Sequence, residues 1–295
     1  MVNVESDTRL FIGGGLAMKR LKVTILVENT VGIPLGILSE WGLSMLLDFG
    51  DERILLDTGE QGNLMSNAQI LGHDLRQIDR VILSHGHYDH TGGLLKFLQY
   101  RGRVPVYAHP DLFSGHYGRG LNGEKNYLGV PFRPEQLESA GAEFHWHREP
   151  VELGPGLWLS GEVPRETAFE RVDDRLVEIK GGQTVPDSIP DDLSLFYVTD
   201  LGLVILLGCA HSGLVNIVEH AKRVTGKGKV RAILGGTHLG PATPDQQKQT
   251  IDYIRGLDLT CLAPNHCTGL GMVSQLAAEF PGSFAFATAG TTLEF

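Results

Sequence analysis

Apolar positions in the first third of the chain follow the two-residue repeat of β-strands more often than the helical repeat. Residues 21–28 (LKVTILVE) alternate as a half-buried strand does, and residues 42–59 contain two apolar runs flanking Gly50 and Asp51, which predicts a hairpin. Residues 80–84 (RVILS) form a short, continuously apolar run typical of a buried strand. Residues 91–99 then have helical spacing, so this part predicts a sheet followed by a helix.

From residue 193 onward, strand and helix patterns alternate. A second hairpin is predicted around Leu201 and Gly202, and Thr243 with Pro244 and Gln246 forms a typical helix start. The predicted helices cover residues 212–224, the stretch from 243, and 272–280, and the predicted strands cover residues 229–236, 259–264 and 284–288.

The middle of the chain, from about residue 111 to 192, has weak periodicity and many turn-forming residues, although residues 157–160 resemble a strand. We expect this stretch to be an insertion or lid. Residues 1–17 differ in composition from the rest and are expected to form a loose arm before a single domain over 18–295. Two hairpin sheets, each followed by helices, predict an α/β (α+β) fold: an αββα sandwich of two mixed sheets with helices on the outer faces.

Composition narrows the class of protein. The 295 residues carry a formal charge of −10 and no block of clustered Lys and Arg, which argues against a nucleic-acid partner. No stretch approaches the roughly 18 apolar residues of a membrane span. The three cysteines form no C-x-x-C motif, which favours a reduced, cytoplasmic setting. We therefore expect a small-molecule substrate, and the sequence leaves the oligomeric state open.

Four residues that commonly bind metals lie close together in the loop after the predicted strand 80–84. His85, His87, Asp89 and His90 fall within six positions. In an extended loop, His85 and His87 point the same way and can share one cation, while Asp89 and His90 turn toward a neighbouring position. Imidazole with carboxylate suits zinc, or iron or manganese where more oxygen ligands are present.

These residues carry a resemblance to a known family. The segment SHGHYDHTGG (84–93) resembles the H-x-H-x-D-H signature of the metallo-β-lactamase superfamily, and Asp57 in LLDTG matches a strand-end aspartate of that family. The motifs GCAHSG (208–213), GGTHL (235–239) and APNHCTG (263–269) are similar to those of one branch, the 7,8-dihydropterin-6-methyl-4-(β-D-ribofuranosyl)aminobenzene-5′-phosphate synthase-like proteins.

The resemblance implies a centre of two divalent metal ions, with zinc favoured over iron or manganese. His211 would complete the site of His85 and His87, and His266 the site of Asp89 and His90. The chain departs from the usual pattern at Cys209, which is either a ligand in place of a bridging aspartate or a buried thiol.

The resemblance also implies roles outside the ligand set. Asp57 and Asp89 would orient ligands and accept protons. His238 is either a ligand in place of His211 or a catalytic contact to substrate, with the second preferred. Tyr88 is expected to line the pocket, and Arg165 either meets an anionic substrate group or forms a surface ion pair.

Three kinds of activity are compatible with this centre. The resembling branch implies a transferase that acts on a small anionic, pterin-like substrate and releases diphosphate. The alternative is a hydrolase of a small ester, lactone, thioester or phosphodiester. A non-haem iron redox protein is the third, although the diiron relatives usually carry a glutamate where this chain has His87.

Overall fold

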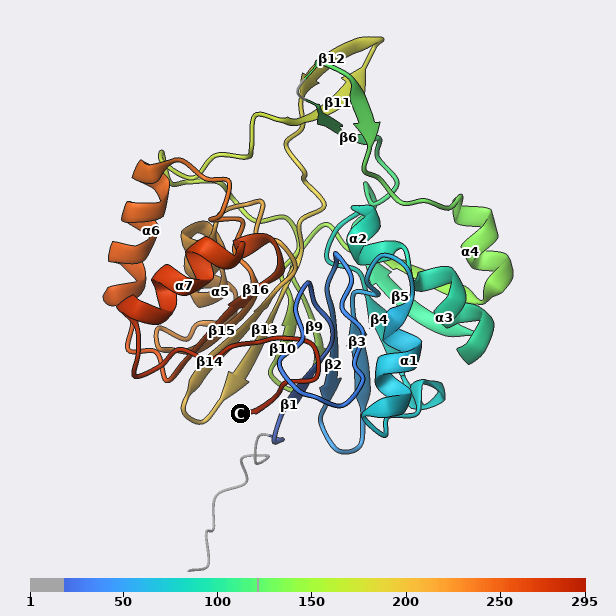
Figure 1. The fold of residues 1–295 in the computed structure, drawn as a ribbon, viewed down its shortest axis with the longest axis horizontal. Coiled ribbons are helices and arrows are strands. Elements are labelled where there is room, and N and C mark those ends of the chain that lie inside the picture. The colour runs from blue at the N-terminus through green and yellow to red at the C-terminus, as the bar shows by residue number, and fades with distance from the viewer. Residues whose placement is uncertain (1–18, 121) are drawn as a thin grey trace, which may run out of the picture.

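The computed structural model describes residues 19–120 and 122–295, so the arm expected over residues 1–17 lies outside the described residues. Two central sheets face each other and helices cover their outer faces, which confirms the predicted sandwich (Figure 1). No helix in the described ranges is long and apolar enough to cross a membrane.

The first central sheet has the strand order β17-β1-β2-β3-β4-β5-β8. Helices α1 (Asn63–Ile70), α3 (Leu94–Arg101) and α4 (Pro134–Ala140) lie along its outer face, and a short 3₁₀ turn spans Leu75–Gln77. Its strands are β1 (Lys22–Val27), β2 (Ser44–Asp48), β3 (Arg53–Leu56), β4 (Arg80–Ile82), β5 (Val104–Ala108), β8 (Ala142–Trp146) and β17 (Thr292–Glu294).

The second central sheet has the order β16-β15-β14-β13-β10-β9. Helices α5 (Leu214–Thr225), α6 (Pro244–Arg255) and α7 (Leu270–Glu279) cover it. Its strands are β9 (Val151–Gly154), β10 (Leu157–Leu159), β13 (Ser194–Thr199), β14 (Gly202–Leu207), β15 (Val230–Gly236) and β16 (Cys261–Asn265).

The core between the two sheets explains the alternation in the sequence. Val23 and Ile25 of β1 point inward against Leu195 of β13 and Val204 of β14, and all four side chains are fully buried. Their alternate neighbours contribute to two further apolar layers beneath the outer helices. Removing this apolar surface from water is the main driving force that holds the layers together.

A third, four-stranded sheet projects above the sandwich; we call it the lid sheet (Figure 1). It consists of β6 (His116–Arg119), β7 (Lys125–Tyr127), β11 (Leu176–Lys180) and β12 (Gln183–Pro186). Both sections that form it belong to the stretch 111–192 that we expected as one insertion. That stretch also supplies β8, β9 and β10 to the central sheets, so only part of it stands apart from the sandwich.

The predicted strand over residues 284–288 is wrong. This segment makes only an isolated bridge between Phe284 and Leu262, and the last strand is β17, which pairs with β1. The alternation of Phe and Ala imitates a strand, but Phe286 faces solvent and the chain turns at Gly290, where φ is +92°. Apolar alternation without a continuous partner strand does not produce a sheet.

Parallel pairing determines where the site forms. Strands β3, β4 and β5 run parallel in the first sheet, and β14, β15 and β16 run parallel in the second. The segments that follow their carboxyl ends therefore meet at one edge of the sandwich, beneath the lid sheet. Such an edge is where α/β proteins commonly build their sites.

Candidate metal centre

The loop after β4 supplies the first part of the site. His85 and His87 lie in extended backbone, and the one-turn helix α2 (Tyr88–Thr91) then carries Asp89 and His90. The Nε2 atom of His85 and the Nδ1 atom of His87 lie 2.9 Å apart. All four side chains are buried, with His85 and His90 fully so.

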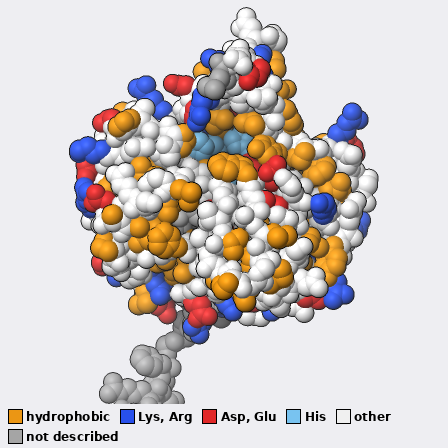
Figure 2. All heavy atoms as spheres, viewed as in Figure 1, with side chains coloured by type: hydrophobic (Ala, Val, Ile, Leu, Met, Phe, Trp, Pro, Cys, Tyr) orange, Lys and Arg blue, Asp and Glu red, His pale blue; other side chains and the backbone are white. Residues whose placement is uncertain are grey.

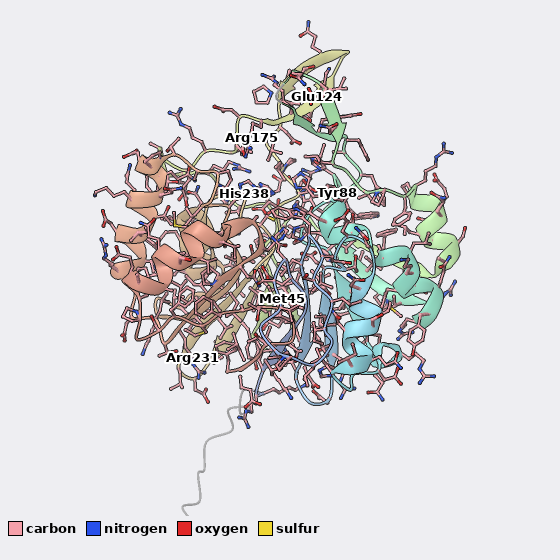
Figure 3. All side chains as sticks on the ribbon, viewed as in Figure 1. Met45, Tyr88, Glu124, Arg175, Arg231 and His238 are labelled. Carbon is pink, nitrogen blue, oxygen red and sulfur yellow. The ribbon has the colours of Figure 1, made fainter. Side chains whose placement is uncertain are left out.

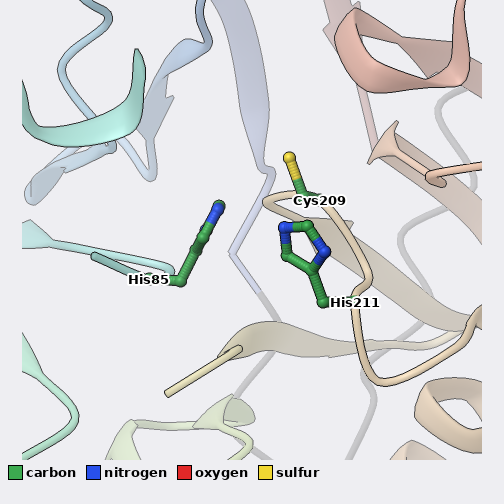
Figure 4. A group of neighbouring side chains, drawn as sticks. All are labelled: His85, Cys209 and His211. Carbon is green, nitrogen blue, oxygen red and sulfur yellow. The ribbon is translucent and has the colours of Figure 1, made fainter. Parts of the chain in front are cut away.

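The second sheet supplies the other part, from segments that follow β14 and β16. Cys209 and His211 form one candidate ligand group with His85, and Cys209 forms another with His90 and His266. Within each group the ligand atoms all lie within 4.8 Å of one another. Figure 4 shows the His85 ring projecting from one loop toward Cys209 and His211 on the other.

Asp89 belongs with the second group. Its Oδ2 atom lies 3.3 Å from Nε2 of His266, and that Nε2 lies 3.2 Å from Nε2 of His90. His90 Nε2 is also 3.1 Å from the Cys209 sulfur. His87 joins the first group, since its ring lies 5.0 Å from that of His211. The fold therefore brings all seven predicted ligand residues together.

The charge states of the first group suit a cation. Burial, reinforced by the neighbouring histidines, lowers the pKa of His85 and His211 well below the ordinary value. Burial likewise lowers the pKa of His87, to about 4. These rings are therefore neutral near pH 7 and have lone pairs to offer. His211 has no hydrogen-bond partner on either nitrogen, and His87 has none on Nε2, among the described residues. Buried imidazoles without partners fit a metal site.

The pKa of His90 is raised rather than lowered, because carboxylates surround its ring. Burial opposes its protonation, but the charges of Asp57 and Asp89 and a hydrogen bond with Asp57 outweigh burial and raise the pKa of His90 to about 9. Asp57 Oδ2 lies 2.7 Å from His90 Nδ1, which leaves Nε2 pointing into the centre. This is the arrangement by which a carboxylate orients a metal-binding imidazole.

Asp57 is itself held firmly. It is fully buried, its Oδ1 accepts a 2.7 Å hydrogen bond from the Ser84 backbone N–H, and its Oδ2 accepts one from the Ser84 hydroxyl at 2.7 Å. Asp57 thus faces Ser84 and His90 rather than the centre itself. Its position supports an orienting role.

Strained backbone is concentrated around the site. Five described non-glycine residues have positive φ angles, and four of them adjoin the centre: Asp57, Ala210, His238 and His266. The fifth, Ile189, lies two residues from Asp191, which accepts a hydrogen bond from the Gly86 backbone N–H at 2.7 Å. Such conformations cost about 1–3 kcal/mol each and cluster where function requires them.

Two residues that no sequence motif indicated hold His266 in place. The Asn29 side-chain oxygen lies 3.0 Å from His266 Nδ1, and a Glu28 carboxylate oxygen accepts a hydrogen bond from the His266 backbone N–H at 2.8 Å. Both residues follow β1, whose end lies at the same edge as the predicted ligands. Their position just after a predicted strand was the only feature of the sequence that pointed to a place in the site.

A second missed group joins the lid sheet to the metal loop. His116 is buried; its ring lies 5.2 Å from that of His87, and its Nδ1 lies 2.6 Å from Oδ2 of Asp187. Burial opposes its protonation, but Asp187 and Asp191 outweigh burial and raise the pKa of His116 to about 10. Because His116 begins β6 and Asp187 follows β12, their contact closes the base of the lid sheet.

The remaining predicted residues occupy three different places. The His238 ring lies 4.4 Å from that of His211, at the mouth of the site. Tyr88 lies on the opposite side of that mouth (Figure 3). The Arg165 guanidinium donates to the backbone carbonyls of His211, at 2.6 Å, and Ser188, at 2.5 Å. Arg165 therefore supports the loops behind the site, and these contacts do not favour the predicted role in binding substrate.

A third group of side chains that commonly bind metals consists of His109, Asp111 and Glu162 and shares no residue with the first two groups. The guanidinium of Arg148 already contacts both carboxylates of this cluster. The positive charge of this arginine neutralises the carboxylates, so a metal ion is not needed there to balance their charge.

Two of the pockets beside the centre open beneath the lid sheet, where histidine side chains are visible in a hollow (Figure 2). A third pocket, of about 330 Å³, is lined by Trp41 and His266. The large pocket has a volume of about 610 Å³, and the small pocket about 320 Å³. The large pocket is lined by Trp41, Leu128, Leu176, Met272 and Cys267, among others. The small pocket is lined by Arg171, His211, Ala242, Thr243 and Gln246, among others. Tyr88 lines neither pocket.

Comparisons with known proteins agree with this geometry. The chain is 31% identical over 288 residues to the 7,8-dihydropterin-6-methyl-4-(beta-D-ribofuranosyl)-aminobenzene-5′-phosphate synthase of Methanocaldococcus jannaschii, covering 93% of this chain and 97% of the relative. An uncharacterized protein of the same organism is 29% identical, covering 86% of this chain and 93% of its own.

Structural comparison gives the same relationship. The crystal structure of Tm1679, described as a metal-dependent hydrolase of the beta-lactamase superfamily, has a TM-score of 0.78 and 26% identity, covering 93% of this chain and 99% of that one. The family model of the metallo-beta-lactamase superfamily matches residues 42–215. The chain therefore belongs to the metallo-beta-lactamase superfamily and is an enzyme.

Proposed function

We propose that the enzyme holds two divalent metal ions and joins two small substrates, with release of diphosphate from one of them. The observation that carries this proposal is the pair of buried ligand groups that share Cys209. Similarity to the synthase over nearly the whole of both chains supports the reaction class. A small anionic, pterin-like molecule is the proposed donor.

In this proposal His85, His87 and His211 hold one ion, and Asp89, His90 and His266 hold the other. The Cys209 sulfur, which belongs to both groups, faces both positions. Zinc suits this mixture of imidazole, thiolate and carboxylate, and iron or manganese are the alternatives. Two such cations polarise a substrate oxygen and neutralise the charge that develops on a leaving group.

The proposed reaction is a substitution at the methylene carbon of the pterin. The bond between that carbon and the diphosphate oxygen breaks, and the diphosphate leaves with the electron pair. An aromatic carbon or nitrogen of the acceptor forms the new bond to the methylene carbon and then loses a proton. We assign that proton to His238, the imidazole at the mouth of the centre.

A hydrolase is the second candidate, because Tm1679 is described as a metal-dependent hydrolase. In that case water, rather than a second organic substrate, attacks an ester, lactone, thioester or phosphodiester. The same metal ligands would serve both reactions, because proteins that share a fold and a type of metal centre catalyse many different reactions.

The test offers the zinc-loaded enzyme a dihydropterin methyl diphosphate, with and without a phosphoribosyl aminobenzene acceptor. We expect pyrophosphate release that depends on the acceptor and is lost in His85→Ala. The control is His73→Ala, a histidine outside the predicted centre, which should retain activity. Acceptor-independent turnover of a panel of esters, lactones and phosphodiesters, lost in the same variant, would replace the transferase with the hydrolase.

A further inference from the structure

Cys267 is a thiol that the proposed centre does not use, although it directly follows the predicted ligand His266. Its side chain is partly buried and lines the large pocket. The Cys267 sulfur accepts a hydrogen bond from the His238 backbone N–H at 3.3 Å, and it lies 3.6 Å from the Cys209 backbone carbonyl oxygen, to which its thiol donates. Cys267 therefore touches the residue whose sulfur belongs to both ligand groups.

Three parallel strands bring the two cysteines together. Cys209 follows β14 and Cys267 follows β16, with β15 between these strands. The last residue of β15 is Gly236, which pairs with Asn265 and donates its backbone N–H to the Gly208 carbonyl at 3.0 Å. A Cβ at Gly236 would lie 2.5 Å from the Cys267 sulfur and 3.2 Å from the Cys209 Cα. Because glycine has no side chain, the two cysteines meet across the end of the middle strand.

This arrangement suits a disulfide. Two cysteines can be bridged without backbone movement only when they are close neighbours whose side chains face each other. Burial raises the pKa of the Cys209 thiol, and the Cys267 side chain adds to the rise, as a close neighbour does. The Cys209 sulfur lies 3.1 Å from His90 Nε2, so rotation about the Cys209 Cα–Cβ bond is the movement that pairing requires. Cys261 begins β16 and lies at the opposite end of that strand from Cys267.

We propose that Cys209 and Cys267 form a reversible disulfide when a peroxide enters the large pocket, and that this bond withdraws the Cys209 sulfur from the metal centre. The effect on metal rests on the proposed ligand role of Cys209, whereas the disulfide rests only on the contacts between the two cysteines. Reversible disulfides of this kind are typical of redox-sensing proteins.

The chemistry takes two steps. In the first, the Cys267 thiolate attacks one oxygen of hydrogen peroxide, the O–O bond breaks, and the departing hydroxide takes up the thiol proton as water, which leaves a sulfenic acid. The His238 N–H supports negative charge on the attacking sulfur. In the second, the Cys209 sulfur attacks the Cys267 sulfur, the S–O bond breaks, and the oxygen leaves as water with the Cys209 proton. The two thiols lose two electrons, which reduce one peroxide to two waters.

The first measurement follows the thiols of the full-length, chelator-treated protein. After hydrogen peroxide and then catalase, thiols are counted with a chromogenic disulfide reagent in denaturant. We expect the count to fall from three to one, and a phosphine reductant should restore it. Mass spectrometry of a non-reduced digest should identify one pair of peptides, joined through Cys209 and Cys267, in a monomeric chain.

The second measurement follows the metal. Zinc affinity is determined by competition with a chromogenic chelator before oxidation, after oxidation and after re-reduction. We expect oxidation to weaken zinc binding by at least ~10-fold and re-reduction to restore it, because both ligand groups lose their shared sulfur.

Variants of the other two cysteines separate the disulfide from general oxidation. Cys267→Ser, or Cys267→Ala if the serine variant does not fold, should keep its remaining thiols, and peroxide should change its zinc affinity less than about 3-fold. Each variant is compared with itself before and after oxidation, so a change in its starting affinity does not affect the result. Cys261→Ser is the matched control, and its thiol count should fall from two to none with the same loss of zinc affinity.

Three retained thiols after peroxide treatment, a disulfide that includes Cys261 or joins two chains, or an equal loss of zinc affinity in Cys267→Ser would overturn the inference. Zinc affinity that is unchanged by the Cys209–Cys267 disulfide would overturn its effect on metal. In that case zinc binding by reduced Cys209→Ser identifies the failed step, since normal affinity would show that Cys209 is not a ligand. Pyrophosphate release by the reduced enzyme tests the proposed reaction separately.

Discussion

Cys209 is the residue whose role in the centre depends most on its protonation state. Burial raises the pKa of this thiol well above its usual value, and the carboxylates around His90 raise the pKa of that ring to about 9. Both groups therefore carry a proton near pH 7 in the metal-free protein. A metal ion that binds them must displace these protons, so zinc affinity should increase as the pH rises toward 9.

The expected result is release of about two protons per protein on zinc binding at pH 7, measured by calorimetry in buffers of different ionisation enthalpy. Cys209→Ser should reduce this release by about one proton. Cys261→Ser is the matched control, because Cys261 lies at the start of β16, away from the centre. Equal proton release in Cys209→Ser and the unmodified protein would show that the thiolate is not a ligand.

Asp57 offers a second prediction at the scale of single residues. Its carboxylate fixes the His90 ring, so Asp57→Asn should keep the size of the side chain but weaken zinc binding by about 10–100-fold, measured by competition with a chromogenic chelator. The control, Asp51→Asn, removes only an exposed ion pair with Lys19. Zinc affinity that is unchanged in Asp57→Asn would contradict the orienting role.

Among the structural elements, the lid sheet is joined at its base by a buried contact. His116 and Asp187 join its two base strands, and both side chains are buried. We expect His116→Ala to speed amide hydrogen exchange in residues 116–119 and 176–180, while exchange in β14 stays unchanged. Lys125→Ala, which removes only a hydrogen bond to Thr184 farther up the sheet, is the control. Unaltered exchange in both segments would show that His116 does not anchor the lid sheet.

The elements also show what the sequence could predict. Strands such as β1, β13 and β14 were evident because their side chains are buried on both faces, between the sheets and beneath the outer helices, which makes them rich in apolar residues. Strands β8 and β9, over residues 142–154, were not predicted because they are edge strands with much exposed surface, whereas β10 matches the strand-like residues 157–160. For the site, the clustered motif indicated only His85, His87, Asp89 and His90, and the family resemblance added Cys209, His211 and His266. Asn29 and His116 lie near the predicted ligands only because of tertiary packing, and no local sequence pattern indicates such a contact.

On the scale of the whole molecule, the predicted ligands connect the two central sheets. His85 and His87 follow a strand of the first sheet, whereas His211 and His266 follow strands of the second. Metal bound to both halves stabilises only the folded state, so excess zinc should raise the melting temperature by at least ~5 °C over the chelator-treated protein. The double variant His85→Ala, His211→Ala should show a much smaller rise in calorimetry. A melting temperature independent of zinc would contradict this role.

The central claim is that two metal ions lie between the sheets, and an anomalous difference map of zinc-loaded crystals, collected at the zinc absorption edge, tests it most directly. The predicted result is two peaks roughly 3.5–4 Å apart, one beside His85, His87 and His211, the other beside Asp89, His90 and His266. Imidazole nitrogens should lie about 2.0–2.1 Å from their ion. No peak at these residues, or a single peak elsewhere, such as beside His109, Asp111 and Glu162, would contradict the account.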